Sequence, residues 1–215
     1  MQNKLFDLMF KKQAKLNDLT YPNWKLRLSR VDWKSAVLVE AGELLESFGY
    51  KWWKKQEQEK DIDNIKVELI DILHFMLSLL HYESEFVREI AKNKFVNSFK
   101  EEKQITNDKE FKMHLISITG YNAIDFAFED LAELFKYVGM NFDEVYKAYF
   151  TKNVLNEFRQ KNGYKTGNYI KIWRYNNSAV EDNVVAYDIA TKFPADENFE
   201  KELLKELEKI YKNIL

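Results

Sequence analysis

The chain has 215 residues, of which 46% are hydrophobic and 15% aromatic, so it is long enough to bury one sizeable core. Its 33 Lys and Arg residues nearly balance 35 Asp and Glu residues, and this balance argues against a nucleic-acid-binding protein that depends on a basic surface. Because there is no cysteine, disulfides, thiol catalysis and thiolate metal sites are excluded.

The sequence is that of an all-α protein. Only 2 Pro and 6 Gly interrupt it, and apolar residues recur at spacings of three and four rather than two. In chain order, helices are predicted over Lys4–Leu19, Asp32–Gly49, Asn64–Glu85, Glu110–Tyr137 with a break at Gly120, Asp143–Asn162 and Glu197–Leu215. We expect a helical bundle without strands, with residues 1–215 as one domain.

One segment departs from this periodicity. Residues 86–108 are rich in Lys, Glu, Asn and Gln and have weak apolar spacing, so we expect an exposed excursion there. It would belong to a smaller flexible lobe around residues 86–142.

The distribution of charge predicts a soluble, cytoplasmic protein without a membrane partner. Lys, Asp and Gln interrupt the apolar residues of the N-terminal segment, which therefore lacks the continuous apolar stretch of a signal peptide. The most hydrophobic segment, Ile65–Leu80, contains charged residues and is too short to span a bilayer.

Two of the predicted helices carry paired carboxylates in apolar surroundings. Glu40 and Glu43 lie within AVLVEAGELLESF, and Glu68 and Asp71 lie within IKVELIDILHFMLSLL. Residues three apart share a helix face, and a buried carboxylate without a positive partner is costly. Four converging carboxylates suit a hard cation such as Mg²⁺ better than zinc or copper, and Mg²⁺ usually accompanies phosphate chemistry. The alternative is a structural cluster paired with Lys or Arg.

A basic block follows much later in the chain. Lys152, Asn156 and Arg159 fall at i, i+4 and i+7, so they share one face of the expected helix. The Gly-containing loop after that helix adds Lys165 and Lys171, and these residue types bind phosphoryl oxygens. The alternative is a solvated basic face. Together with the acidic site, the block indicates a metal–polyphosphate substrate.

Four motifs follow one another along the chain. They are Glu40-x-x-Glu43, KWWK at 51–54, Glu68-x-x-Asp71 followed by His74 and Phe75, and KNVLNEFRQKNGYKTGNY at 152–169. Their order resembles the dimeric, all-α dUTPases along most of the chain. The acidic residues alone would fit the wider all-α NTP pyrophosphohydrolase superfamily, including MazG-like enzymes, whereas KWWK and FRQ-x-x-GYK-x-G-x-Y are more specific to the dUTPases.

The resemblance implies a bundle of the all-α NTP pyrophosphatase type, a homodimer and a mobile segment that closes on the substrate. The implied reaction is hydrolysis of dUTP to dUMP and pyrophosphate, and of dUDP to dUMP and phosphate. Glu40, Glu43, Glu68 and Asp71 would hold more than one Mg²⁺, with Mn²⁺ as a substitute. Glu43 is the expected general base for the attacking water, and Glu40 is the alternative.

The same resemblance implies residues for the base, the sugar and the phosphates. Gln13 and Asn17 would read the uracil edge or the ribose, because amides both donate and accept. Trp53, His74 and Phe75 would wall the base pocket, with Phe75 packed where a 2′-hydroxyl would sit; the alternative for these residues is a place in the core. The residues implied for the phosphate chain are Lys54, Lys152, Asn156, Arg159, Tyr164, Lys165, Lys171 and Asn183.

Two other functions fit the residues. A broader NTP pyrophosphohydrolase would use the same carboxylates with a different base pocket, and a helical binding or regulatory protein would keep the acidic cluster for structure alone. A di-iron bundle fits less well, because two E-x-x-H elements are expected and Asp71-x-x-His74 is the nearest approach.

Overall fold

The computed structural model describes residues 1–53, 59–102, 104–120 and 124–213. It is predominantly helical, which confirms the predicted all-α class. The chain divides into two compact units, Met1–Val145 and Tyr146–Leu215, with the boundary inside helix α8 (Phe142–Lys161).

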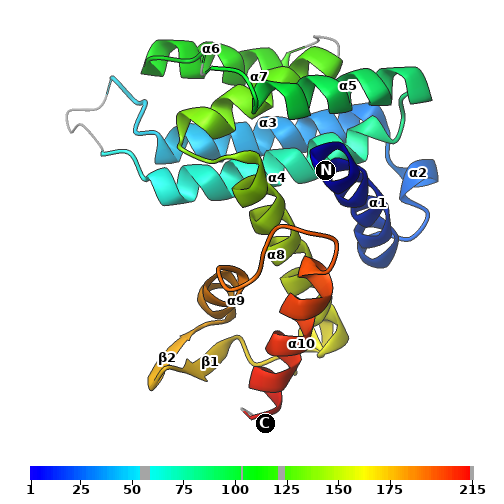
Figure 1. Ribbon diagram of the computed structural model, residues 1–215, viewed down its shortest axis with the longest axis vertical. Helices are drawn as coiled ribbons and strands as arrows, with labels where there is room; N and C mark the ends of the chain where they lie inside the picture. The colour runs from blue at the N-terminus through cyan, green and yellow to red at the C-terminus, as the bar shows by residue number, and fades with distance from the viewer. Residues whose placement is uncertain (54–58, 103, 121–123, 214–215) are drawn as a thin grey trace. The chain divides into compact units, whose positions relative to one another are not determined.

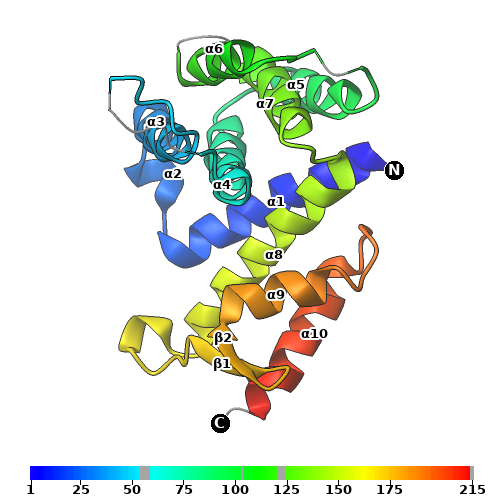
Figure 2. The same cartoon turned by 90° about the vertical axis from the view of Figure 1, so that its left-hand side faces the viewer.

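The first unit is a set of packed helices (Figure 1). They are α1 (Gln2–Thr20), α2 (Trp24–Arg27), α3 (Arg30–Ser47), α4 (Ile62–Leu80), α5 (Glu85–Ser98), α6 (Asp108–Thr119) and α7 (Ile124–Tyr137). Helix α3 lies along α4, α5 and α6 pack on α7, and α1 contacts α4 and α5 (Figures 1 and 2). The two helices that carry the paired carboxylates are therefore neighbours.

Side-chain caps fix where α3 and α4 begin. The Ser29 side chain accepts a hydrogen bond from the Asp32 backbone N–H, and the Asp32 side chain accepts one from the Ser29 N–H, which is a capping box. Asp61 caps α4 by accepting from the Asn64 N–H at 3.0 Å, and its own N–H donates to the Ser47 carbonyl at 2.9 Å. The end of α3 is thereby tied to the start of α4.

Helix α5 occupies most of the segment for which we expected an exposed excursion, so that expectation is wrong. Ala91 and Phe95 are completely buried, and the Phe95 ring lies 5.5 Å from that of Phe6 and 5.9 Å from that of Phe128. The apolar stripe is only one or two residues wide per turn, and the surrounding Lys, Glu and Asn residues hide it from a search for periodicity.

The second unit combines the rest of α8 with a short hairpin and two further helices. Its elements after α8 are a 3-10 turn at Tyr164–Thr166, β1 (Ile172–Tyr175), β2 (Ser178–Glu181), α9 (Asp182–Ala190) and α10 (Phe199–Lys212). Helix α10 confirms the helix predicted near the C-terminal end, and its Phe199, Leu203 and Leu207 side chains are buried.

The hairpin corrects the expectation that strands are absent. β1 and β2 pair antiparallel, with Ile172 opposite Glu181 and Tyr175 opposite Ser178. Asn176 and Asn177 connect them at φ values of 47° and 64°, in the left-handed region that asparagine tolerates. Each strand has only four residues, too few for a clear alternating pattern.

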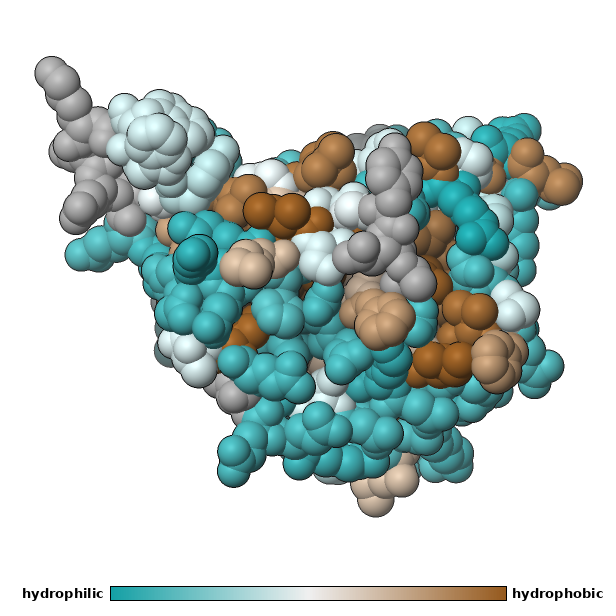
Figure 3. Space-filling view, turned by 90° about the horizontal axis from the view of Figure 1, so that it is seen from above, coloured by the Kyte–Doolittle hydropathy of each residue, from teal (hydrophilic) through white to brown (hydrophobic). Residues whose placement is uncertain are grey.

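None of the helices in the described ranges is long and apolar enough to cross a membrane. Seen from above, the surface is largely hydrophilic and is interrupted by scattered apolar residues (Figure 3). Met113, Ile116 and Phe126 are among the exposed hydrophobic side chains of α6 and α7.

Candidate active site

Three of the four predicted carboxylates converge between α3 and α4. One oxygen from each of Glu40, Glu68 and Asp71 lies within 4.8 Å of the others. Glu68 is only 7% exposed, and Glu40 and Asp71 are half-buried. The direct packing of α3 on α4, together with the spacing of three between Glu68 and Asp71, brings the three side chains to one place.

The cluster has the electrostatics of a cation site. Burial, the nearby Asp71 charge and a hydrogen bond with Glu68 raise the pKa of Glu40 to about 7. Burial and repulsion by the neighbouring carboxylates therefore both disfavour the ionised form of Glu40. Oxygen donors of this kind suit a hard divalent cation, whose charge would favour the ionised form of Glu40. The residues present therefore fit Mg²⁺ or Mn²⁺.

Glu43 lies one turn beyond Glu40 and is exposed to solvent. It is outside the group of three converging carboxylates, but its charge contributes to the raised pKa of Glu40. Glu43 therefore borders the cluster on its solvent side.

Asn64 and Ser47 support the cluster, and the sequence analysis missed both. The Asn64 side-chain amide donates to Glu68 Oε1 at 3.0 Å and to Ser47 Oγ at 2.6 Å. Ser47 Oγ in turn donates to the Glu43 carbonyl at 3.2 Å. This contact could have been predicted from the sequence, because residues four apart, such as Asn64 and Glu68, share a helix face.

A buried polar row joins α1 to α4. Gln13 Nε2 donates to Asn17 Oδ1 at 2.9 Å, and Asn17 Nδ2 donates to Ser78 Oγ at 2.9 Å. The Gln13 Oε1 atom accepts from His74 Nδ1 at 2.8 Å, which assigns the proton of the imidazole to Nδ1. His74 and Ser78 follow Asp71 at i+3 and i+7, so the row continues the helix face that carries the carboxylates. Ser78 was not predicted.

The aromatic residues expected to wall a base pocket have different surroundings. Phe75 is half-buried and packs with the core cluster of Trp24, Trp33 and Leu79, its ring 6.1 Å from that of Trp33. Trp53 is 56% exposed and meets the rings of its neighbours Tyr50 and Trp52 edge-on. The predicted phosphate ligand Lys54 lies outside the described residues.

The other predicted phosphate ligands belong to the second unit. Lys152, Asn156 and Arg159 are half-buried on α8, as is Asn183 on α9, whereas Tyr164, Lys165 and Lys171 are exposed. Lys171 Nζ lies 3.6 Å from Glu181.

Arg159 is already paired with a carboxylate that was not predicted. Its Nε and Nη2 atoms donate to the two oxygens of Asp182, each at 2.7 Å, while Nη1 lies 3.5 Å from Asn156 Oδ1. Arg159 and Asp182 are 23 positions apart, so helical spacing in the sequence does not predict that they are in contact.

Comparison with known proteins agrees with this arrangement. A dUTPase family model matches residues 5–164, about three quarters of the chain, and this span contains the carboxylates of α3 and α4 and the polar row. Lys165, Lys171 and Asn183 follow the matched span. Comparison with curated proteins gave no match. The chain therefore belongs to the family of all-α dUTPases and is a metal-dependent dUTP diphosphatase that hydrolyses dUTP to dUMP.

Proposed function

We propose that Glu40, Glu68 and Asp71, with Glu43 beside them, hold the Mg²⁺ ions for hydrolysis of dUTP to dUMP and pyrophosphate. The convergence of three carboxylate oxygens within 4.8 Å is the observation that carries this assignment. When bound, Mg²⁺ neutralises the phosphate chain and lowers the pKa of a coordinated water, and Mn²⁺ is the expected substitute. More than one ion suits the number of carboxylates.

Glu43 and Glu40 are proposed to have different roles in proton transfer and metal binding. Glu43 is exposed and borders the cluster, so it is the proposed base that accepts a proton from the attacking water. Glu40, the alternative base, is the carboxyl whose proton the cation displaces, because its pKa is about 7 without metal.

We assign recognition of the base to the polar row. The Gln13 amide accepts a hydrogen bond from His74 through its oxygen and donates one to Asn17 through its nitrogen. These two bonds fix which end of the amide is the donor and which is the acceptor. A fixed amide distinguishes uracil from cytosine, because the two bases exchange a donor for an acceptor at the pyrimidine edge. Phe75 and Trp53 are proposed to contact the sugar and base, with Phe75 excluding a 2′-hydroxyl.

The phosphate chain is assigned to the polar and basic residues of the second unit. The proposed ligands are Lys152, Asn156, Arg159, Tyr164, Lys165, Lys171 and Asn183, together with Lys54. Their residue types support this assignment, since ammonium, guanidinium and amide groups all donate to phosphoryl oxygens.

The remaining proposals concern the whole chain. We infer that it acts as a homodimer in the cytoplasm, as one functional domain of residues 1–215 with a mobile lobe around 86–142, and without a nucleic-acid partner. The resemblance to dimeric dUTPases supports the homodimer, and sedimentation equilibrium at micromolar concentration tests it. A mass equal to one chain of 25.8 kDa would contradict it.

A substrate panel tests the nucleotide specificity. We would measure pyrophosphate release from dUTP, dTTP, dCTP, dATP and UTP with Mg²⁺, and phosphate release from dUDP. Selective turnover of dUTP and dUDP is the expected result. Comparable turnover of the other nucleotides would instead assign the broader NTP pyrophosphohydrolase activity and remove the polar row from base recognition.

A further inference from the structure

Asp182 is fully buried in the first turn of α9, and it accepts hydrogen bonds from three residues. Arg159 donates to both carboxylate oxygens at 2.7 Å, the Tyr169 hydroxyl donates to Oδ2 at 2.8 Å, and the Asn183 N–H donates to Oδ1 at 2.9 Å. The paired bonds from Nε and Nη2 fix both the position and the plane of the guanidinium group.

The carboxylate remains ionised in this setting. Burial alone would raise the pKa of Asp182, but the hydrogen bonds from Arg159 and Tyr169 outweigh burial and lower it. The ion pair therefore persists throughout the neutral pH range.

The pair leaves Arg159 able to bind a second anion. A guanidinium group has five N–H donors, and the contact with Asp182 uses two of them. Nη1 lies on the side of Asn156, and 19% of the Arg159 side chain remains accessible. One phosphoryl oxygen can therefore be bound without breaking the contact with Asp182.

Asp182 also contacts the backbone of two other predicted phosphate ligands. Its backbone N–H donates to the Lys171 carbonyl at 2.9 Å, just before β1, and its side chain accepts from the next residue, Asn183. Asp182 thus contacts the Arg159 side chain on α8, the backbone just before β1 and the backbone at the start of α9. All of these except Arg159 follow residue 164, where the family match ends.

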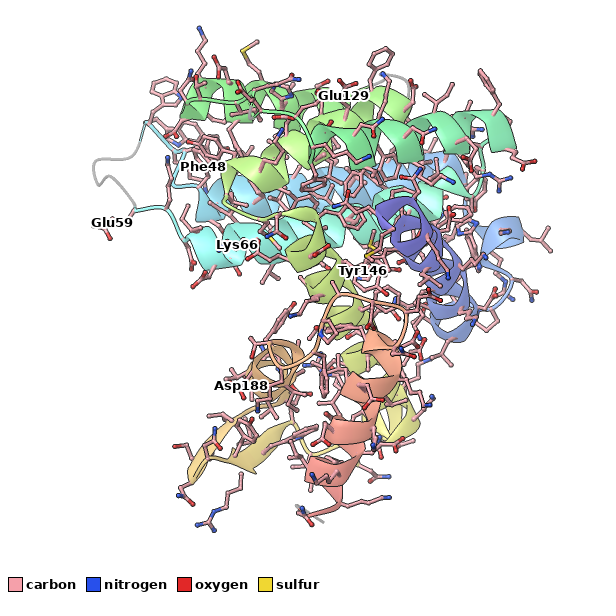
Figure 4. All side chains as sticks on the ribbon, viewed as in Figure 1. Phe48, Glu59, Lys66, Glu129, Tyr146 and Asp188 are labelled. Carbon is pink, nitrogen blue, oxygen red and sulfur yellow. The ribbon has the colours of Figure 1, made fainter. Side chains whose placement is uncertain are left out.

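A second aspartate on α9 provides a comparison. Asp188, which Figure 4 labels, lies on the same helix. It accepts from the Tyr175 hydroxyl at 2.5 Å and pairs with Lys192 at 3.1 Å, so it also meets one tyrosine and one cation. Asp188 is exposed and already links β1 to α9. A buried ion pair contributes little net stability compared with apolar packing. A role in joining α9 to the neighbouring elements therefore does not explain why the Asp182–Arg159 pair is buried.

We propose that Asp182 is a positioning residue for phosphate binding, which aims Arg159 at the substrate and sets the backbone of Lys171 and Asn183. The inference rests on the proposed function, because it takes these three residues as phosphate ligands.

A double-mutant cycle on the full chain tests the proposal. Binding of a non-hydrolysable imido analogue of dUTP would be measured by calorimetry with Mg²⁺ for the wild type, Asp182→Asn, Arg159→Gln and the double variant. Gln keeps an amide beside Asp182, so the carboxylate retains a donor. Each single change should weaken binding about tenfold, and Asp182→Asn should add little once Arg159 is replaced, because the two act through one contact.

Matched variants separate positioning from folding. Asp188→Asn makes the same chemical change on the same helix and should leave the dissociation constant within about twofold. Tyr169→Phe keeps the ion pair but removes one donor, and should weaken binding about threefold. If Asp182→Asn does not fold, as judged by circular dichroism, unchanged binding by folded Tyr169→Phe overturns the proposal.

The outcomes distinguish the positioning role of Asp182 from the assignment of Arg159 as a phosphate ligand. If Arg159→Gln weakens binding and Asp182→Asn does not, the positioning role is wrong while the phosphate assignment stands. Additive effects in the double variant would also overturn it, since independent residues do not share a contact. If Arg159→Gln binds as the wild type does, the phosphate assignment fails and the positioning role fails with it.

Discussion

Two carboxylate centres of this protein face opposite electrostatic surroundings. In the first unit, Glu40 lies among other carboxylates, and burial and their charges raise its pKa to about 7. In the second unit, Asp182 is more deeply buried, yet Arg159 and Tyr169 hold its pKa below the usual value. Burial raises the pKa of both carboxyl groups, and only at Asp182 do the hydrogen bonds and a cationic partner outweigh it.

The difference separates a proposed metal-binding centre from a carboxylate that pairs with a cation of the chain itself. The carboxylates of α3 and α4 reach full ionisation most readily when a metal ion is present, so their charge state depends on solution conditions. The Asp182–Arg159 pair is complete within the chain. Four variants or conditions test this contrast.

The largest effect is expected from Glu68→Gln. It removes a charge from the cluster and should lower dUTP turnover at least about a hundredfold, because the ion loses an anionic ligand. Pyrophosphate release and the rise in melting temperature on adding Mg²⁺ would both be measured. Asp63→Asn, a fully exposed acid on the same helix, is the control. Normal turnover by Glu68→Gln would remove this residue from the metal site.

Removing the cation from the other centre should mainly affect stability. Arg159→Met leaves Asp182 buried without its ion-pair partner and should lower the free energy of unfolding by about 3 kcal/mol. Lys192→Met, beside the exposed Asp188, should change it by less than about 0.5 kcal/mol. Urea denaturation measures both. Equal losses would show that the two aspartates depend on their cations to the same extent.

The pH dependence of the first centre should follow the ionisation of Glu40. Since its pKa is about 7, the apparent affinity for Mg²⁺ should fall about fivefold between pH 7 and pH 6, as protons compete with the cation. Without metal, the folded state retains this proton better than the unfolded state, so stability should decrease as the pH rises from about 4.5 to about 7.

Melting temperatures in EDTA, measured from pH 5 to pH 8, give the stability part of this prediction. Glu40→Gln should flatten the decrease, because an amide does not titrate. An equally steep decrease in that variant would assign the titration to another group.

The smallest effect is expected at Asn64, the neutral donor beside the anionic cluster. Asn64→Ala removes the hydrogen bond to Glu68 and should weaken Mg²⁺ binding about threefold, because the side chain is exposed and water can replace it. Ser47→Ala keeps the bond from Asn64 to Glu68 and is the matched control. Metal titration followed by melting temperature measures both, and a larger loss in Ser47→Ala would reverse the assigned roles.

Local rules predicted the helical framework and its acidic face. Glu40, Glu68 and Asp71 were identified because the spacing of residues three apart within apolar runs is read directly from the sequence. Helices α3 and α4 each begin two residues before the predicted start, because Ser29 and Asp61 cap them.

Contacts between distant segments were not predictable in the same way. The pairing of Arg159 with Asp182 and the packing of Phe95 against Phe6 depend on tertiary structure, which local spacing does not encode. The hairpin was missed because two four-residue strands joined by Asn176 and Asn177 are shorter than the windows in which alternation becomes visible.

The position of Asp182 has a consequence for how this enzyme can vary among related chains. The carboxylates of α3 and α4 lie inside the segment shared with the family, whereas Asp182 and most of the residues it organises follow it. If the proposed phosphate ligands after residue 164 hold the triphosphate, substitutions there would change its affinity while the carboxylates of α3 and α4 stay the same. Affinity and catalysis would then be open to separate selection within one gene.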